Sequence, residues 1–163
     1  MKSLLIDPLK CKGCGRCEVA CSFEHDKEFN PAKSRIGVLR RKEIASAFPT
    51  LCLQCSNPLC AIPCPTNAIS KDEKTGVVDI DPDLCVGCSM CVIACPLGAI
   101  SISLEGKTPV KCDECGGGEP ACAKACEYGA IEYIEMDEAN IIRRRRGIEK
   151  LSEMLNMIEG GKK

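Results

Sequence analysis

The chain has few of the residues from which a protein core is normally built. Its 163 residues include no tryptophan, two tyrosines, three phenylalanines and a single histidine. Hydrophobic residues make up 45%, but that figure includes sixteen cysteines. Without them the share falls to roughly a third, which is low for a globular core. A chain this poor in large apolar side chains usually needs covalent or metal crosslinks in order to fold.

The sequence also lacks the motifs of most enzyme classes. No G-x-G-x-x-G run follows a strand pattern, no P-loop is present, and no nucleophile–base arrangement stands out. There is no run of about 18 apolar residues, so we expect no membrane span. The first residues, MKSLLIDPLK, lack the apolar core of a signal peptide. We therefore expect a reducing, cytoplasmic location, with export on a partner's signal as the alternative.

Cysteine is present in excess, at roughly a tenth of the chain. The cysteines form four quartets, each beginning with C-x2-C and ending with C-x3-C, and we call the last cysteine of each the remote cysteine. In chain order, quartets one to four are Cys11, Cys14, Cys17, Cys21; Cys52, Cys55, Cys60, Cys64; Cys85, Cys88, Cys91, Cys95; and Cys112, Cys115, Cys122, Cys126. Quartet three, followed by Pro96, matches the bacterial iron–sulfur run C-x2-C-x2-C-x3-C-P, and quartet one has the same spacing.

This spacing suits a cubane cluster. Three closely spaced thiolates let one loop bind three irons, and the remote cysteine points toward a neighbouring cluster. Gly13, Gly15 and Gly87 lie between ligands, where glycine lets the backbone approach inorganic sulfide. Sixteen thiols supply four [4Fe–4S] clusters with no thiol left over, and every iron would have a cysteine ligand. The sixteen cysteines are therefore the expected iron ligands, no catalytic residue is expected, and the clusters are expected to carry single electrons.

The sequences that flank the quartets are repeated. CPTNAIS begins at Cys64, CPLGAIS at Cys95 and CEYGAIE at Cys126. The alternating residues after each Ala-Ile predict short strands, at Ile69, at residues 100–102 and at residues 131–133. Residues inside C-x3-C, such as 92–94, predict short helices, and residues 74–76 predict a hairpin turn. The segment NPAKSRIGVLRRKEI, residues 30–44, is expected to form a loop followed by an edge strand, and residues 137–158 a C-terminal helix.

Other interpretations of these residues are possible. Zinc sites with four cysteines usually join two C-x2-C pairs over a dozen or more residues, whereas these triplets are closely packed. A disulfide scaffold fits poorly with adjacent C-x2-C pairs.

His25 is expected to be an ordinary polar loop residue, because all four ligand shells are already full. The Arg143–Arg146 run is either a solvated helix end or a docking site for an acidic partner, because the acidic, aromatic-poor chain does not favour nucleic-acid binding.

The order of the four quartets, with CSFEHDKEFNPAKSRIGV and CLQCSNPLCAIPCPTNAIS, resembles a family of electron-transfer subunits. These are the beta subunits of molybdenum and tungsten oxidoreductases of the dimethyl-sulfoxide-reductase and formate-dehydrogenase type. Small proteins that serve aldehyde ferredoxin oxidoreductase, carbon-monoxide dehydrogenase and hydrogenase are similar. The likeness covers about residues 2–134.

The resemblance implies that the quartets pair crosswise. The implied sets are Cys11, Cys14, Cys17, Cys126 (cluster 1); Cys112, Cys115, Cys122, Cys21 (cluster 2); Cys52, Cys55, Cys60, Cys95 (cluster 3); and Cys85, Cys88, Cys91, Cys64 (cluster 4). The implied fold is α+β and loop-rich, with two ferredoxin-like dicluster modules related by pseudo-twofold symmetry. Within a polyferredoxin region of residues 1–134, module A would comprise residues 1–50 and 103–134, and module B residues 51–102. Residues 135–163 would form a helical extension that docks to a partner.

The resemblance also implies a function: an electron-transfer subunit, non-catalytic on its own, with four low-potential clusters. It would connect a large catalytic subunit to a ferredoxin, a flavin or NAD subunit, or another redox complex. The first expected partner is an anaerobic tungsten- or molybdenum-pterin oxidoreductase of the aldehyde-oxidising kind, including related aromatic-acyl-CoA reductases. Carbon-monoxide dehydrogenase or hydrogenase is the second. A free polyferredoxin without an obligate partner and an iron–sulfur assembly protein are the alternatives.

Overall fold

The computed structural model describes residues 2–41, 46–103, 106, 108–137 and 140–141. The chain divides into two compact units, one of residues 4–133 and one of residues 1–3 with 134–163. The helices and strands in chain order are β1 (Lys2–Ile6), η1 (Pro8–Lys10), α1 (Arg16–Asp26), η2 (Pro31–Lys33), β2 (Gly37–Arg41), β3 (Ser46–Thr50), β4 (Ile69–Lys71), β5 (Val78–Ile80), α2 (Met90–Ala94), β6 (Ile100–Ile102), β7 (Pro109–Lys111), η4 (Glu114–Gly117), α3 (Ala121–Lys124) and β8 (Ile131–Glu135).

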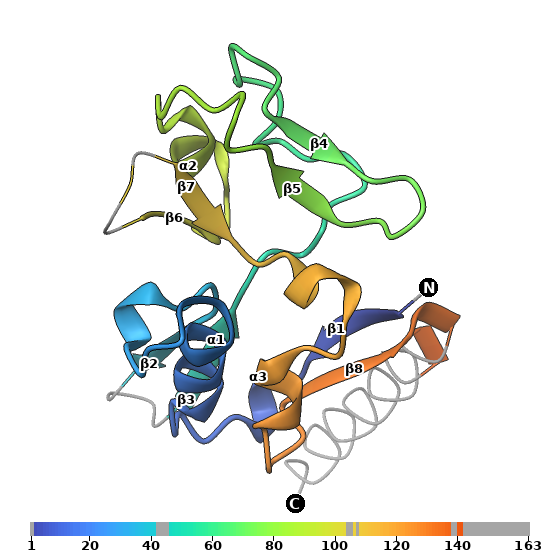
Figure 1. Ribbon diagram of the computed structural model, residues 1–163. Helices are drawn as coiled ribbons and strands as arrows, with labels where there is room; N and C mark the ends of the chain where they lie inside the picture. Colours follow the sequence, from blue (N-terminus) through green and yellow to red (C-terminus); the bar gives the residue numbers. More distant parts are fainter. Residues whose placement is uncertain (1, 42–45, 104–105, 107, 138–139, 142–163) are drawn as a thin grey trace, which may run out of the picture. The chain divides into compact units, whose positions relative to one another are not determined.

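The strands pair only in twos within the described residues. β2 pairs with β3, β4 with β5, and β6 with β7, each antiparallel, and β1 pairs with β8. Figure 1 shows these pairs as short ribbons joined by long loops, with α1 and α3 side by side. The fold is therefore a small, loop-rich α+β arrangement, as the sequence predicted.

The repeated Ala-Ile segments form the predicted strands. Ile69 begins β4, Ile100 begins β6 and Ile131 begins β8, and each of these isoleucines is buried. The predicted turn at residues 74–76 also forms, because Asp72 accepts hydrogen bonds from the backbone of Lys74 and Thr75. Local sequence thus determines these elements.

Cysteines are part of the hydrophobic core. One group of buried residues draws on segments 17–51 and 112–131 and includes Cys17, Cys21, Cys112 and Cys122. A second group draws on segments 69–100 and includes Cys91. The division of residues 1–134 into two modules stays a proposal, and this grouping supports it. In a chain with so few aromatics, the ligand-bearing loops supply much of the interior.

The loop and strand predicted within residues 30–44 form, as η2 and the loop that leads into β2. Before them, α1 continues past Cys21 to Asp26, and its C-terminal cap is Lys27, whose backbone is left-handed. Ser22 is fully buried and accepts a hydrogen bond from the backbone N–H of Asn30. The predicted single edge strand is a hairpin of β2 and β3.

The C-terminal prediction lies almost entirely outside the described residues. Residues 136–137 and 140–141 are helical, whereas the rest of the predicted helix, with Arg143–Arg146, falls in the part that the structure does not describe. Among the residues that it does describe, no helix is both long enough and apolar enough to cross a membrane.

Candidate iron–sulfur sites

One pocket is lined by four cysteines from two distant quartets. Cys11 and Cys14 come from the loop before α1, Cys17 from α1 itself, and Cys126 from the segment that follows α3. The pocket holds about 320 Å³ of space not filled by protein atoms, part of it open to solvent. These are the four thiols of the proposed cluster 1.

A second pocket repeats the arrangement. Its cysteines are Cys85 and Cys88 from the loop before α2, Cys91 on α2, and Cys64 from the end of quartet two. It holds about 300 Å³, again partly open to solvent. Three neighbouring thiols of one quartet and the remote thiol of another thus line this pocket too, as in the proposed cluster 4.

The pKa shifts of two buried thiols indicate which cysteines of the other two sets lie close to one another. Burial raises the pKa of Cys122 strongly, and the nearby thiols Cys112, Cys21, Cys115 and Cys17 raise it further. Burial likewise raises the pKa of Cys60, with smaller contributions from Cys52 and Cys95. Apart from Cys17, which belongs to the proposed cluster 1, these neighbours are members of the proposed clusters 2 and 3. The assignment of all sixteen ligands stays a proposal, which these groupings support.

The buried thiols resist ionisation when no metal is bound. Burial raises the pKa of Cys17 and of Cys112 to about 12. A thiolate there needs a nearby positive charge, and iron supplies it. The chemistry of the donors, all soft sulfur in groups of four, therefore fits an iron–sulfur core. No group of three or more His, Cys, Asp or Glu side chains in the described residues stands close enough to hold a single metal ion.

Each C-x2-C has a left-handed residue before its second cysteine. Quartets one and three use glycine there, Gly13 with φ of 68° and Gly87 with φ of 70°. Quartets two and four use Gln54 with φ of 48° and Glu114 with φ of 53°. Side chains rarely adopt this conformation. The same turn thus occurs four times, and in quartets two and four it carries a steric cost because the left-handed residue has a side chain.

Three remote cysteines accept the same backbone hydrogen bond. The amide N–H groups of Ala68, Ala99 and Ala130 donate to the sulfur atoms of Cys64, Cys95 and Cys126, at 3.3, 3.4 and 3.3 Å. Each alanine is the fourth residue after its cysteine and belongs to the repeated Ala-Ile. Such donors stabilise a thiolate and help to set the potential of a bound cluster.

The fourth remote cysteine, Cys21, has different partners. Its sulfur accepts from the backbone N–H of Arg35 at 3.3 Å and lies 3.8 Å from Nδ1 of His25. Burial alone would raise the pKa of Cys21, but the hydrogen bonds of His25, Arg35 and Ser34 outweigh it and lower the pKa. Because α1 continues through Cys21, distant residues replace the amide of the repeat.

The prediction that His25 is an ordinary loop residue was wrong. His25 lies on α1 with its side chain only 11% exposed, and its Nε2 donates to Oδ1 of Asp113 at 3.0 Å. Asp113 also pairs with Arg35 at 2.7 Å. The hydrogen bonds to Asp113 and Cys21 raise the pKa of His25 to about 10. His25 therefore supports a thiol and links quartet one to quartet four.

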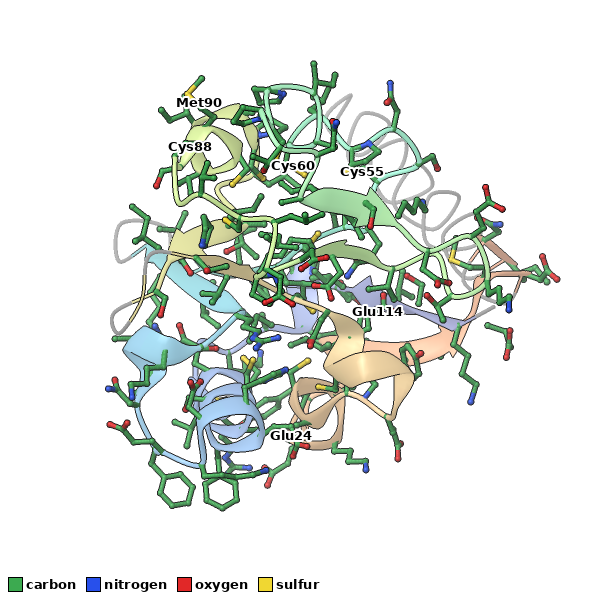
Figure 2. The ribbon with its side chains drawn as sticks, turned by 45° about the horizontal axis from the view of Figure 1, so that its top comes forward. Glu24, Cys55, Cys60, Cys88, Met90 and Glu114 are labelled. Carbon is green, nitrogen blue, oxygen red and sulfur yellow. The ribbon has the colours of Figure 1, made fainter. Side chains whose placement is uncertain are left out.

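The exposed thiols are the second cysteines of three quartets, namely Cys14, Cys55 and Cys88. Figure 2 shows Cys55 and Cys88 on separate loops. A ligand at the surface brings its cluster near solvent, where a redox partner can approach.

Sequence reasoning identified these cysteines but missed the polar residues that contact the ligand loops. Gln54 and Asp113 are variable residues inside two C-x2-C spacings and Lys111 directly precedes quartet four, but each also bonds a residue that is remote in sequence.

Comparisons with known proteins agree with this chemistry. A family described as a 4Fe–4S dicluster domain matches residues 44–136, and another of the same description matches residues 10–69. A relative from Pyrococcus furiosus, a polyferredoxin-like subunit of an aliphatic sulfonate oxidoreductase, is 39% identical over 137 residues, which are 84% of this chain and 78% of the relative.

Two further proteins are similar. The beta subunit of an NADH-dependent phenylglyoxylate dehydrogenase from Aromatoleum evansii is 37% identical over 81% of this chain, which spans only 30% of that relative. A chain of the active-site complex BamBC of benzoyl coenzyme A reductase has 24% identity and a TM-score of 0.49, over 98% of this chain and 97% of that one. The dicluster match covers more than half of the sequence, and the sixteen cysteines provide ligands for two such domains. The chain belongs to the family of 4Fe–4S dicluster domain proteins and carries ligands for four [4Fe–4S] clusters.

Proposed function

We propose that the chain is an electron-transfer subunit in which the quartets bind four clusters crosswise, as sets 1 to 4 above. The observation that carries this proposal is the pair of pockets, each lined by three cysteines of one quartet and the remote cysteine of another. When bound, the clusters supply one-electron redox chemistry. Because every set has four thiolates, none leaves an iron open for substrate.

The protein's own residues prepare these sites. The left-handed turns fold the ligand loops, and the amides of Ala68, Ala99 and Ala130 donate to three remote cysteines. The surface positions of Cys14, Cys55 and Cys88 give electrons places to enter and leave. Module A, closed by both ends of the chain, and module B, in its middle, would together form one path.

The proposed partner is a large catalytic subunit. The Pyrococcus furiosus and Aromatoleum evansii relatives are named as subunits of oxidoreductases, which supports a role within a complex. Within this class we propose a tungsten- or molybdenum-pterin oxidoreductase of the aldehyde-oxidising kind, with a ferredoxin, flavin or NAD subunit at the other end of the path. We further propose a cytoplasmic location, because a reducing compartment keeps thiols available for iron.

Anaerobic affinity purification of the tagged chain from its own organism tests this function. We expect a large subunit to co-purify, identified by mass spectrometry, with tungsten or molybdenum by elemental analysis. The complex should bleach when substrate is added, because electrons reach the clusters. A large subunit containing nickel would replace the proposed partner with carbon-monoxide dehydrogenase or hydrogenase. A monomer on size exclusion that exchanges electrons with unrelated enzymes would overturn the subunit role in favour of a free polyferredoxin.

A further inference from the structure

A buried lysine lies between the ligand loops of the two modules. Lys111 is the last residue of β7, directly before the first cysteine of quartet four, and is only 3% exposed. Its partners are two carbonyl oxygens, and no carboxylate pairs with it in the described part of the chain. A buried ammonium group without a counter-charge is unfavourable, so this position calls for negative charge nearby.

The two carbonyl groups come from different parts of the fold. One belongs to Val78 at the start of β5, within the proposed module B. The other belongs to Cys112, a proposed ligand of cluster 2 in module A, and lies 2.8 Å from the ammonium nitrogen. Lys111 therefore connects the modules through charged hydrogen bonds.

Gln54 forms a parallel connection between the same two residues. Its side-chain Nε2 donates to the carbonyl of Cys112 at 3.0 Å, and its Oε1 accepts from the backbone N–H of Val78 at 2.9 Å. Gln54 also occupies the left-handed position that is glycine in quartets one and three. This bridging explains why a side chain is present where glycine would fit more easily.

The charge of Lys111 acts on a thiol of the proposed cluster 3, and the thiols of clusters 2 and 3 act on each other. It lowers the pKa of Cys60, a proposed ligand of cluster 3, although burial, the larger effect, raises that pKa. Cys52, from the same set, raises the pKa of Cys112, after the larger effects of burial, Cys21 and Asp113. The loops of clusters 2 and 3 are thus neighbours, and Lys111 lies between them.

We propose that Lys111, supported by Gln54, is the positioning and charge-compensating residue for electron passage between clusters 2 and 3. The inference rests on the proposed function and adds to it a specific residue at the junction of the modules. One electron passes, one cluster is oxidised and the other reduced, no covalent bond forms or breaks, and no proton moves. The positive charge of Lys111 favours the reduced state of both clusters, so that their reduction potentials lie above the values they would have without it.

EPR-monitored redox titration of the anaerobically prepared, cluster-loaded protein tests this. We expect Lys111→Met to lower two of the four potentials, so that the ratio of reduced to oxidised cluster at the wild-type midpoint falls about tenfold, or about 59 mV for one electron. Lys111→Arg, which keeps the charge, should leave all four near their wild-type values. Lys74→Met is the matched control, since it removes the same charge from an exposed turn.

Gln54→Glu keeps the inference testable if a Lys111 variant fails to take up sixteen irons. It places a negative charge beside the ammonium group and should lower the same two potentials. Unchanged potentials in Lys111→Met or in Gln54→Glu, or an equal shift of all four, would overturn the inference. These results differ from a failure of the proposed function, which would show in the wild type as fewer than four clusters.

Discussion

At the scale of single residues, a substitution of Cys126 can distinguish crosswise pairing of the quartets from cluster binding within one quartet. The reason is that Cys126 lines a pocket with Cys11, Cys14 and Cys17. We expect Cys126→Ala to disturb the cluster of these three cysteines and to leave the cluster of Cys85, Cys88 and Cys91 unchanged. EPR of the reduced protein, with iron and sulfide analysis, measures this. Cys64→Ala is the matched control, because it should have the reverse effect. Loss of the cluster of Cys112, Cys115 and Cys122 in Cys126→Ala, with the cluster of quartet one intact, would show binding within one quartet and contradict the pairing.

His25 gives a prediction that depends on pH. Folding raises its pKa from 6.5 to about 10, so the protonated form stabilises the folded state. This contribution is complete below about pH 6.5 and is lost as pH rises through about 10. We expect His25→Gln to cost roughly 2 kcal/mol of unfolding free energy at pH 6, as for a hydrogen bond between charged groups, and almost nothing near pH 10.5.

Denaturant unfolding of both proteins from pH 6 to 10.5 measures the difference. Glu24→Gln, an exposed change on the same helix, is the control and should show no such trend. A difference that stays constant across the range would mean that His25 acts only by packing. Asp113 remains ionised throughout this range, because its hydrogen bond with His25 and its pairing with Arg35 outweigh burial and lower its pKa.

The sixteen proposed ligands can be read from the sequence because a cubane requires several thiols at short spacing. The residues around them cannot. His25 bonds to Asp113, which is 88 residues later in the sequence, and Lys111 bonds to Val78, which is 33 residues earlier. No spacing rule joins such pairs, because tertiary folding alone brings them together. Gln54 likewise stands where the repeat suggests glycine, and its role follows only from its hydrogen bonds.

At the scale of elements, α1 explains why quartet one has Ser22 where quartets two and three have Pro65 and Pro96. The helix continues through residue 22, where proline would lack a backbone donor and clash with the preceding turn. We expect Ser22→Pro to destabilise the protein by about 3 kcal/mol. The reverse change, Pro96→Ser, lies in an exposed turn and should cost about 0.5 kcal/mol or less.

Circular dichroism during denaturant unfolding tests both substitutions. Equal stability of Ser22→Pro and wild type would show that α1 is not required beyond Cys21. The extent of this helix was not predictable, because Phe23 is the only apolar residue among residues 22–26 and forms no apolar stripe. The short strands were predictable, because each Ala-Ile is followed by alternating residues, and the isoleucine that begins each strand is buried.

At the scale of the whole molecule, stability depends on the clusters, because apolar side chains are scarce and cysteines fill much of both cores. We expect removal of iron by a chelator under anaerobic, reducing conditions to abolish most of the helical signal in circular dichroism. Readdition of iron and sulfide should restore it and bring sixteen irons per chain. A chelated protein that keeps its spectrum and cooperative unfolding would show that the polypeptide folds alone.

The two cysteine-lined pockets also imply an order of events during synthesis. Cys64, Cys85, Cys88 and Cys91, which line one pocket, are all translated before Cys126, which lines the other. Domains generally begin to fold as the chain emerges from its N-terminus. Under the proposed pairing, the central site can therefore receive its cluster first, whereas Cys11, Cys14 and Cys17, although translated earliest, would wait for Cys126. A translation arrest before Cys126, with Cys91 already outside the ribosome, would then leave the central site filled and the first site open.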